Sequence, residues 1–416
     1  MTNFAPPPGT SDIMPEEIGI WHFMENAAHK VFRLYGYGEI RTPVLEFTEV
    51  FIHGLGSETD VVRKEMYTLK DRGGRDLTLR PEGTAGIIRA LCATDIFAGS
   101  DKKVYYMGPM FRGERPAAGR KRQFHQIGVE NAGRILPEFD AECIFMFMHY
   151  LQEVGIEGHS LLMSTRATPE DRKPAEKALN EYFSSHISEM CEDCKTRLER
   201  NIWRILDCKN PQCAPFISGT PDMLGYFGDD SRRHFEKVCS LLDRMNVKYK
   251  VEPRLVRGLD YYVHTVFEVT HPGLGAQNAL AGGGRYRIRP SGAKKEVEGI
   301  GFAAGMERLV MALQNHGSHT QEAPFAYVAP LCAEAVLPCL ETAKGLRLAN
   351  LSTIAEYDPR SLKSALRAAG RISAKFAIVA GENELEKSSF LCKDMKNGTQ
   401  REFSMSEIVA QLISQI

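Results

Sequence analysis

The sequence has no excess of charge of either sign. Its 416 residues include 52 lysines and arginines against 53 acids, for a formal net charge of −1. A strongly basic balance is therefore absent, and any nucleic acid must be bound through local basic patches. Long apolar runs are also lacking, because none approaches the ~18–20 residues of a membrane span. We therefore expect no membrane association.

Targeting and repeat signals are missing as well. The start, "MTNFAPPPGTSDIMPEE", lacks the basic-then-apolar order of a secretory signal, and we find no internal repeat or low-complexity tract. We expect a cytoplasmic chain whose 10 cysteines are mostly reduced. The composition, 43% hydrophobic and 25% charged, is that of a globular protein, and the length suggests two or three domains.

The first 160 residues predict helices combined with an antiparallel sheet. Ser11 or Asp12 is expected to cap a helix through "IGIWHFMENAAHKVFRLYG", whose apolar residues at helical spacing predict core packing. The stretch "MYTLKD-RGG-RDLTLRPE" predicts a hairpin, because two alternating segments flank a Gly-Gly turn. Such hairpins favour an antiparallel sheet over alternating βαβ units.

After residue 160 the predicted secondary structure changes twice along the chain. Residues 161–251 are predicted to be a small, mostly helical insertion, after which sheet-like sequence resumes, so that 1–160 and 252–320 are expected to form one core. "QNHGSHTQEAP" predicts a polar linker. Residues 323–416 alternate strand-like and helix-like segments and predict a compact α/β domain. Without further information, that domain is equally well interpreted as an α/β interaction module.

Polar residues at strand ends are the candidates for chemistry. The segment "RGLDYYVHTVFEV" at 257–269 begins a predicted strand with an arginine, an aspartate and two tyrosines, although buried strands normally exclude unpartnered charge. In "FRGERPAAGRKRQFHQIGVE", a strand, a basic loop and a return strand place Phe124, Gln126 and Glu130 on one face. Arginines there could grip a phosphate, although a solvated basic hairpin is the plainer interpretation.

Two shorter stretches complete this set. "GFAAGMERL" places Arg308 just inside a helix after a glycine-spaced strand, where small residues allow a ligand to approach closely. "LRPEGT" places Glu82 and Thr84 at a strand end. Each stretch alone is a weak signal, since Glu82 would ordinarily be a helix cap or a surface acid.

Together these stretches resemble the histidyl-tRNA synthetases, a family of class II aminoacyl-tRNA synthetases. "GYGEIRTPVLEF" is similar to motif 1 of that class, Phe111–Glu114 with Arg122–Gln126 to motif 2, and Gly301–Leu309 to motif 3. "RGLDYYVHTVFEV" and "AGGGRY" resemble the two signatures specific to histidine enzymes. The resemblance covers nearly the whole chain. It implies an α+β catalytic domain on an antiparallel sheet, with the helical insertion, and a C-terminal α/β anticodon-binding domain.

The resemblance also implies roles for individual residues. Arg257 and Arg112 are expected to be catalytic, with Arg257 contacting the histidine carboxylate and the α-phosphate of ATP. The resemblance implies binding of ATP by Arg112, Glu114, Arg122, Phe124 and Arg308. It implies binding of histidine by Glu82, Thr84, Gln126, Glu130, Tyr261 and Tyr262. Buried polar groups of this kind reject amino acids that cannot pair with them.

The implied reaction has two steps, adenylation of L-histidine by ATP with Mg²⁺ and transfer of histidine to the 3′ end of tRNA(His). A homodimer with motif 1 at its interface is implied as well. The alternatives are a synthetase-like regulatory subunit of ATP phosphoribosyltransferase and a class II synthetase for glycine, threonine or proline. The arginines at 112, 257 and 308 favour the enzyme, and Glu130, Tyr261 and Tyr262 favour histidine.

One stretch departs from the family pattern, and the role of one group of cysteines is left undecided by the sequence. After Tyr286, the family often has an acid and then a glycine, whereas here Arg287 begins a basic loop. The insertion contains "CEDC" and "CKNPQC". Cys191, Cys194, Cys208 and Cys213 therefore form either a tetrahedral structural zinc site or four reduced thiols.

Overall fold

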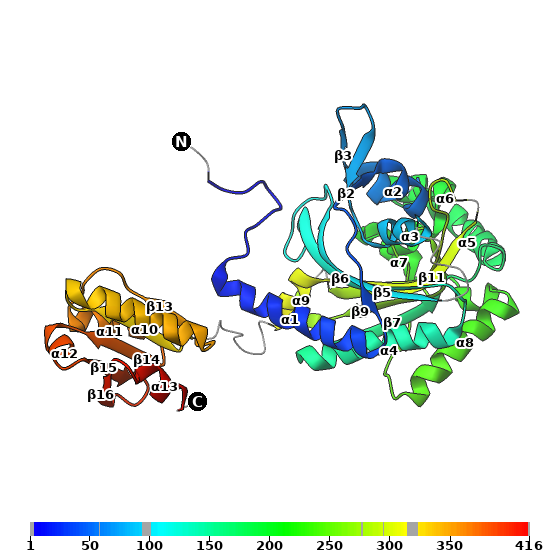
Figure 1. Ribbon diagram of the computed structural model, residues 1–416. Coiled ribbons are helices and arrows are strands. Elements are labelled where there is room, and N and C mark those ends of the chain that lie inside the picture. Colours follow the sequence, from blue (N-terminus) through cyan, green and yellow to red (C-terminus); the bar gives the residue numbers. More distant parts are fainter. Residues whose placement is uncertain are drawn as a thin grey trace. The chain divides into compact units, whose positions relative to one another are not determined.

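The computed structural model describes residues 4–57, 59–93, 101–275, 278–293, 295–313 and 323–414. The chain divides into two compact units, Met1–His319 and Thr320–Ile416, each with a core of its own. Residues 314–322 of the predicted linker lie outside the described residues. Figure 1 labels the elements of both units.

A large sheet forms the centre of the first unit. Within its described residues, eight strands follow the order β1-β5-β6-β11-β10-β9-β7-β8. Only β1·β5 and β7·β8 are parallel, so the antiparallel sheet predicted from the sequence is confirmed. The strands are β1 (Gly38–Glu39), β5 (Lys102–Phe111), β6 (Gln123–Ala132), β7 (Ser160–Thr165), β8 (Lys250–Val251), β9 (Tyr262–Thr270), β10 (Ala279–Ile288) and β11 (Val297–Gly305).

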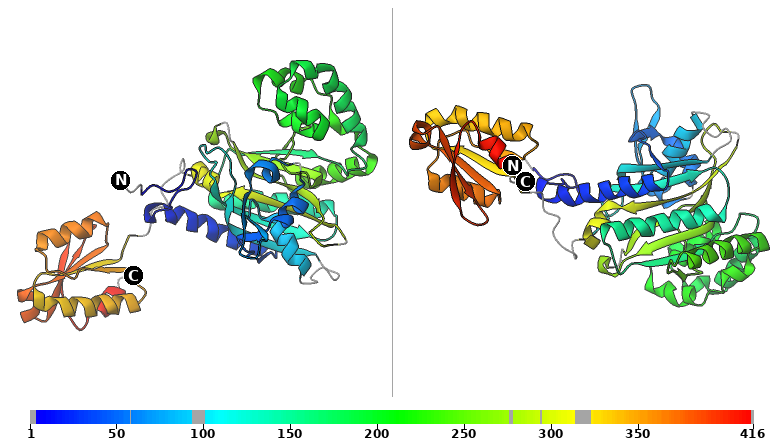
Figure 2. Two further views of the ribbon diagram at one scale, coloured as in Figure 1. Left: turned by 90° about the horizontal axis from the view of Figure 1, so that it is seen from above. Right: turned by 60° about the horizontal axis from the view of Figure 1, so that its bottom comes forward.

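Three long helices cover one face of this sheet (Figures 1 and 2): α1 (Pro15–Leu34), α4 (Pro137–Val154) and α8 (Asp229–Arg244). The apolar stripe of α1 is buried here, with Phe32 contacting Tyr105, Tyr150 and Phe302. The expected cap at Ser11 or Asp12 is wrong. The N-cap is Met14, because Pro15 fixes the first helical φ and needs no hydrogen-bond acceptor.

The opposite face carries smaller elements around a second core. These are α2 (Thr48–Leu55), η1 (Val61–Glu65), α3 (Thr84–Ala93), and a three-stranded sheet of β2 (Leu45–Phe47), β4 (Asp76–Leu79) and β3 (Tyr67–Lys70). The predicted hairpin is confirmed, since β3 and β4 pair antiparallel from Tyr67↔Leu79 to Lys70↔Asp76. Helix α9 (Met306–Leu313) follows β11, and η6 (Pro272–Leu274) precedes β10.

The insertion is helical but narrower than residues 161–251. β7 pairs with β9 in the main sheet, and α8 packs on α4 through Phe235, Val238 and Leu242. The residues with a separate core run from Ala167 to Phe227. They contain α5 (Lys173–His186), η2 (Ile187–Glu189), α6 (Glu192–Arg200), η3 (Ile202–Asp207), η4 (Pro211–Cys213), α7 (Ala214–Ser218) and η5 (Met223–Tyr226).

The second unit is an α/β domain, as predicted. Within its described residues, five strands follow the order β13-β12-β14-β15-β16, in which β12 is parallel to β13 and β14 and the other pairs are antiparallel. Its strands are β12 (Ala326–Pro330), β13 (Thr353–Ala355), β14 (Phe376–Ala380), β15 (Ser389–Asp394) and β16 (Gln400–Ser404). Its helices are η7 (Ala333–Ala335), α10 (Val336–Leu348), α11 (Leu362–Arg371), α12 (Glu382–Glu386) and α13 (Ile408–Ile413).

This second sheet buries both faces. Along β12, Ala326 and Val328 contribute to one core cluster while Tyr327 and Ala329 contribute to another, as the period of two in a strand requires. Among the described residues of the whole chain, no helix combines the length and the apolar character needed to cross a membrane.

Candidate active site

A cavity of about 760 Å³ opens in the first unit, between residues that are far apart in the sequence. It lies over the central strands, where β6 pairs with β11 and β11 with β10. Eleven of the twelve residues expected to bind substrates line it: Glu82, Thr84, Arg112, Glu114, Phe124, Gln126, Glu130, Arg257, Tyr261, Tyr262 and Arg308.

One end of the cavity is acidic and buried. Glu82 precedes α3, and its carboxylate accepts hydrogen bonds from the backbone N–H groups of Thr84 (2.7 Å) and Ala85 (2.8 Å). The Thr84 hydroxyl donates to Glu130 Oε1 at 2.6 Å. Burial raises the pKa of Glu82 and raises that of Glu130 to about 8. The two acids are therefore held close together with less than their full negative charge near neutral pH.

This end also offers polar atoms without partners. Gln126 Oε1 and Glu130 Oε2 are buried and make no hydrogen bond to any described residue. Such atoms are costly unless a ligand or water satisfies them. A Cβ at Gly301, which pairs with Glu130, would overlap Glu130 Oε2, so glycine is needed to give the carboxylate room.

Tyr261, Tyr262 and Tyr286 are three of the tyrosines that line the same end. The rings of Tyr261 and Tyr262 meet edge to face with centroids 4.7 Å apart, and Tyr286 lies 5.9 Å from Tyr261. All three are almost fully buried, and burial raises the pKa of each, so their hydroxyls stay protonated. Rigid aromatic walls with hydroxyl groups suit a small planar ligand that needs both a donor and an acceptor.

The two histidine-type signatures meet at Arg257. Its guanidinium pairs with Glu268, and a Cβ at Gly282 would overlap the guanidinium. The glycines of "AGGGRY" therefore leave space for the arginine of "RGLDYY". Because Arg257 lies beside the tyrosines and also near Arg112 and Arg308, it sits where the acidic and basic ends of the cavity meet.

The other end of the cavity is basic. Arg112 Nε donates to the Pro81 carbonyl at 2.9 Å, and its guanidinium carbon lies 5.3 Å from the centre of the Phe124 ring. Glu114 pairs with Arg120 from the loop between β5 and β6. Burial lowers the pKa of the Arg112 guanidinium, and the nearby Arg257 charge lowers it further.

Arg308 adds a further cation at the start of α9. It is held by two backbone carbonyls, Nε to Gly119 at 3.0 Å and Nη1 to Ala279 at 2.7 Å. Burial lowers its pKa, and the positive charges of Arg120, Arg257 and Arg112 lower it too. Arginines held this close together repel one another unless an anion lies between them, so this end is built for a polyanion.

Arg122 and Arg287 point elsewhere. Arg122 Nε donates to the Glu114 carbonyl at 3.1 Å, and Arg122 is not among the described residues that line the cavity. It supports the loop that carries Glu114. Arg287 donates to Glu298 at 2.8 Å across the β10–β11 pair, so an acid on the neighbouring strand offsets the unexpected arginine.

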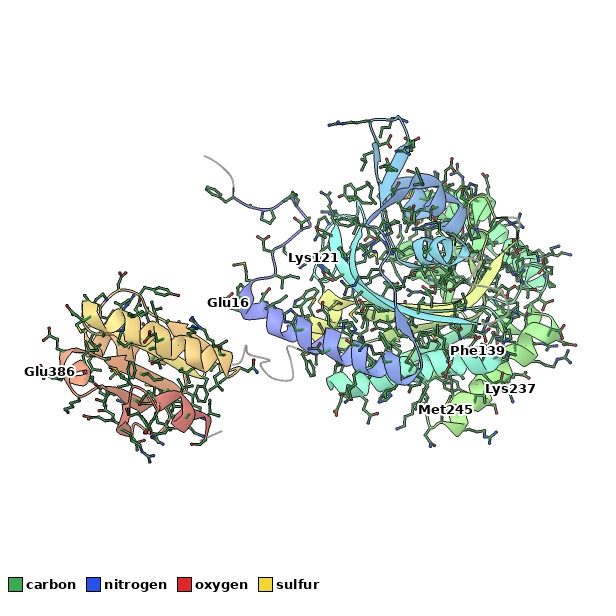
Figure 3. The ribbon with its side chains drawn as sticks, in the orientation of Figure 1. Glu16, Lys121, Phe139, Lys237, Met245 and Glu386 are labelled. Atoms are coloured by element: carbon green, nitrogen blue, oxygen red, sulfur yellow. The ribbon has the colours of Figure 1, made fainter. Side chains whose placement is uncertain are left out.

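Arg120 and Glu268 are among the cavity residues that are absent from the site expected from the sequence. Glu268 could have been predicted, because a charged residue in the apolar strand "TVFEV" needs a partner of opposite charge. Nothing in the sequence distinguishes Arg120 from the other cations of its loop. Lys121 of the same loop, labelled in Figure 3, donates to the Ser11 hydroxyl at 2.6 Å.

The fold and the cavity are those expected of the catalytic domain of a class II aminoacyl-tRNA synthetase. An antiparallel sheet bears arginines on one side of a pocket and acids and tyrosines on the other. The sequence model described as "Histidyl-tRNA synthetase" matches residues 9–168 and 226–309, and the one described as "Anticodon binding domain" matches 325–415. The chain belongs to the histidyl-tRNA synthetase family.

Individual relatives agree with this assignment. The chain is 41% identical over 410 residues to histidine–tRNA ligase of Halothermothrix orenii, covering 98% of each sequence. It is 42% identical over 408 residues to the ligase of Fervidobacterium nodosum, covering 97% of this chain and 96% of that one. The structure of apo Staphylococcus aureus histidyl-tRNA synthetase has a TM-score of 0.81 at 32% identity, covering 99% of this chain and 100% of that one.

Proposed function

We propose that this chain activates L-histidine with ATP and transfers it to the 3′ end of tRNA(His). The observation that carries the proposal is the division of one cavity into a basic end and an end of buried acids and tyrosines, with Arg257 between them. Adenylation joins a carboxylate to a phosphate, so it needs a polyanion site and an amino-acid site that meet at one cation.

The basic end suits ATP. Arg112 and Arg308 would hold phosphate oxygens, and Phe124 and Glu114 would lie against the adenine. Mg²⁺ would accompany ATP, and the carboxylates of Glu114 and Glu268 would offer it oxygen donors of the kind it prefers in this part of the cavity. The chemistry supplied by the ion is neutralisation of phosphate charge. The protein's contribution is to align the two substrates.

The acidic end suits histidine. Glu82, Thr84 and Gln126 would receive the α-ammonium group, whose three donors match the unpartnered Gln126 oxygen and the acids. Glu130 and Tyr262 would bracket the imidazole, one accepting and one donating, while Tyr261 lines the pocket. The histidine carboxylate would then point to Arg257. That guanidinium would stabilise the charge that develops as the carboxylate attacks the α-phosphorus and the bond to the β-phosphate breaks, which gives histidyl-adenylate and releases pyrophosphate.

The chain is also proposed to act as a homodimer. Large apolar side chains are exposed together on the three-stranded sheet and its approach: Val44, Leu45, Phe47, Tyr67 and Leu69. They lie in and beside the motif 1 segment, and a second copy would bury them. Light scattering of the purified chain should give twice the chain mass, and Leu69→Asp should shift it toward the monomer.

Transfer to tRNA gives the direct test of the full function. The purified protein is incubated with labelled histidine, ATP and either tRNA(His) or a tRNA for another amino acid. Accumulation of histidyl-tRNA(His) alone supports the proposal. The alternative, a regulatory subunit without synthetase activity, predicts histidine binding and no charging of any tRNA. The retained Arg112, Arg257 and Arg308, all on the cavity wall, favour the enzyme.

A further inference from the structure

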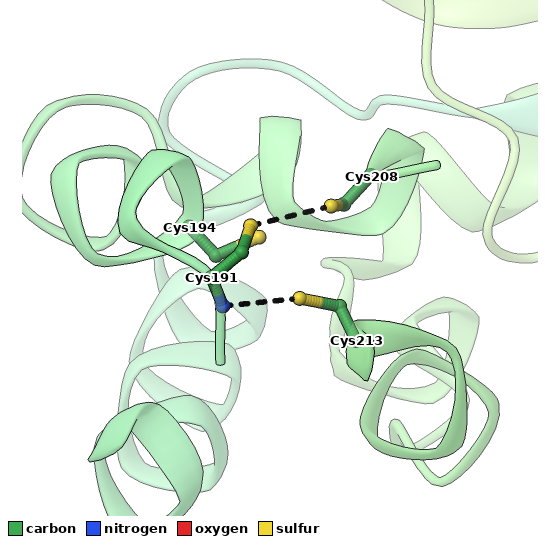
Figure 4. Close-up of side chains that lie close together, drawn as sticks. All are labelled: Cys191, Cys194, Cys208 and Cys213. Atoms are coloured by element: carbon green, nitrogen blue, oxygen red, sulfur yellow. Dashed lines mark hydrogen bonds between the residues drawn. The ribbon is translucent and has the colours of Figure 1, made fainter. Parts of the chain in front are cut away.

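Four cysteines of the insertion converge on one point (Figure 4). The Sγ atoms of Cys191, Cys194, Cys208 and Cys213 all lie within 4.8 Å of one another, and Cys191 and Cys208 Sγ are 3.8 Å apart. Cys194 and Cys213 are buried, whereas Cys191 and Cys208 are partly exposed. The pairs come from separate elements: Cys191 and Cys194 lie at the start of α6, Cys208 directly follows η3, and Cys213 ends η4.

The spacing matches a single tetrahedral ion. With Zn–S bonds of ~2.3 Å, four sulfurs at the corners of a tetrahedron lie ~3.8 Å apart. The observed separations approach this value and exceed the ~2.05 Å of a disulfide bond. An iron–sulfur cluster would place its cysteines on different iron atoms and spread their sulfurs further apart than is seen here.

Backbone N–H groups point at two of the four sulfurs. The backbone N–H of Cys191 donates to Cys213 Sγ at 3.3 Å, and that of Asn210 donates to Cys208 Sγ at 3.5 Å. Cys191 is the N-cap of α6 and Cys194 lies in its first turn, so both sulfurs lie at the positive end of a helix. Backbone donors and a helix N-terminus both lower the cost of negative charge on sulfur.

We propose that Cys191, Cys194, Cys208 and Cys213 bind one Zn²⁺ as a structural site. Four thiolates fill the tetrahedral shell and leave no open position, so the ion holds the fold together and takes no part in chemistry. Thiolates select zinc over hard cations such as Mg²⁺ and Ca²⁺. The proposal does not depend on the proposed activity, because metal content is measured on the protein itself.

The site also has a defined place relative to the cavity. Between the two cysteine pairs, Asn201 Nδ2 donates to Asp260 of the "RGLDYY" turn at 2.7 Å, and Arg204 pairs with Asp60 at 2.5 Å. Leu206 and Asp207, just before Cys208, line the cavity. The ion would therefore fix the segment that braces the turn between Arg257 and Tyr261.

Metal analysis of the full-length protein tests the site. The chain is purified under reducing conditions without chelators, and its zinc is measured by plasma mass spectrometry. We expect about one zinc per chain, and at least about a tenfold lower content in Cys208→Ser and Cys213→Ser. Cys332→Ser, which removes a thiol from the other unit, should keep the zinc. A wild-type chain without zinc, or zinc that survives both variants, would overturn the proposal.

A second measurement covers variants that fail to fold. Wild-type protein stripped of zinc and loaded with Co²⁺ should show the intense visible bands of tetrahedral cobalt–thiolate coordination. Hydrogen exchange of residues 191–213 should speed up when zinc is removed and slow again when it is restored. Absence of the cobalt bands, or four cysteines recovered as two disulfides under reducing purification, would contradict a zinc site.

Discussion

The guanidinium of Arg257 lies where a side chain at Gly282 would otherwise be. These residues come from the two signatures that identify the histidine enzymes in this class, and they lie on neighbouring segments because β9 pairs with β10. The glycine run of "AGGGRY" thus leaves the space that the side chain of the arginine of "RGLDYY" occupies. Glu268, which pairs with Gly282 across the two strands, forms an ion pair with the same guanidinium.

Gly282→Ala should therefore disable the enzyme through Arg257. The added methyl displaces the guanidinium, and we expect histidine-dependent ATP–pyrophosphate exchange to fall about 100-fold, as for a misplaced catalytic group. Gly225→Ala is the matched control, because nothing lies within 4 Å of a Cβ at that residue. Equal, near-normal exchange rates in both variants would show that Arg257 is not held in this way.

Glu130→Gln should remove histidine selectivity. The glutamine keeps the size of the side chain but cannot ionise to a carboxylate that accepts the imidazole N–H, and a buried mismatch of this kind costs on the order of 100-fold or more. The KM for histidine should rise much more than the KM for ATP. An equal rise in both constants would place Glu130 outside the histidine pocket.

The same variant should change how stability depends on pH. Burial raises the pKa of Glu130 from 4.5 to about 8, so the folded chain retains a proton that the unfolded chain releases. Stability therefore falls as the pH rises through this window, with a slope of at most ~1.4 kcal/mol per pH unit.

Glu130→Gln cannot ionise and loses that slope. The free energy of unfolding of the variant, minus that of the wild type, should increase from pH 4.5 to 8 and level off above. Urea unfolding at a series of pH values measures it, with the exposed Glu138→Gln as control. Parallel curves for wild type and Glu130→Gln would mean that Glu130 ionises freely.

Arg308→Lys should impair ATP binding although the charge is kept. Arg308 donates to two carbonyls, those of Gly119 and Ala279, from two different nitrogens, and a lysine ammonium cannot reproduce that fork. We expect the KM for ATP to rise about tenfold. Arg289→Lys, an exposed arginine paired with Glu296, should behave like wild type. A rise confined to the KM for histidine would contradict the assignment.

Arg287→Ala should leave catalysis nearly intact. Arg287 forms a mostly buried ion pair with Glu298 and does not line the described cavity, so its loss should affect the fold more than the chemistry. Exchange should stay within about threefold of wild type. A loss as large as that of Arg257→Ala would mean that the basic loop after Tyr286 belongs to the active site.

Much of the site could be predicted because strands have a period of two. Phe124, Gln126 and Glu130 alternate along one strand, and all three line the cavity. Arg257 could be singled out because the sequence pattern begins a buried strand with a charge, although the strand itself starts only at Tyr262 and Arg257 lies in the segment before it. These are local patterns that the sequence displays directly.

Other features depend on register and packing, which local patterns do not contain. Arg122 and Arg120 lie in one loop, yet only Arg120 lines the cavity. The partner of Arg287 appears only once β10 is aligned with β11. The predicted insertion, residues 161–251, includes most of β7 and all of α8. In the structure β7 pairs with β9 of the main sheet and α8 packs on α4, and no local pattern in the sequence distinguishes them from the insertion.

ATP–pyrophosphate exchange with each standard amino acid in turn measures activation of histidine. We expect exchange with histidine alone, and its loss in Arg257→Ala. Exchange with a different amino acid, or none at all from a folded protein that binds histidine, would contradict the proposed activity.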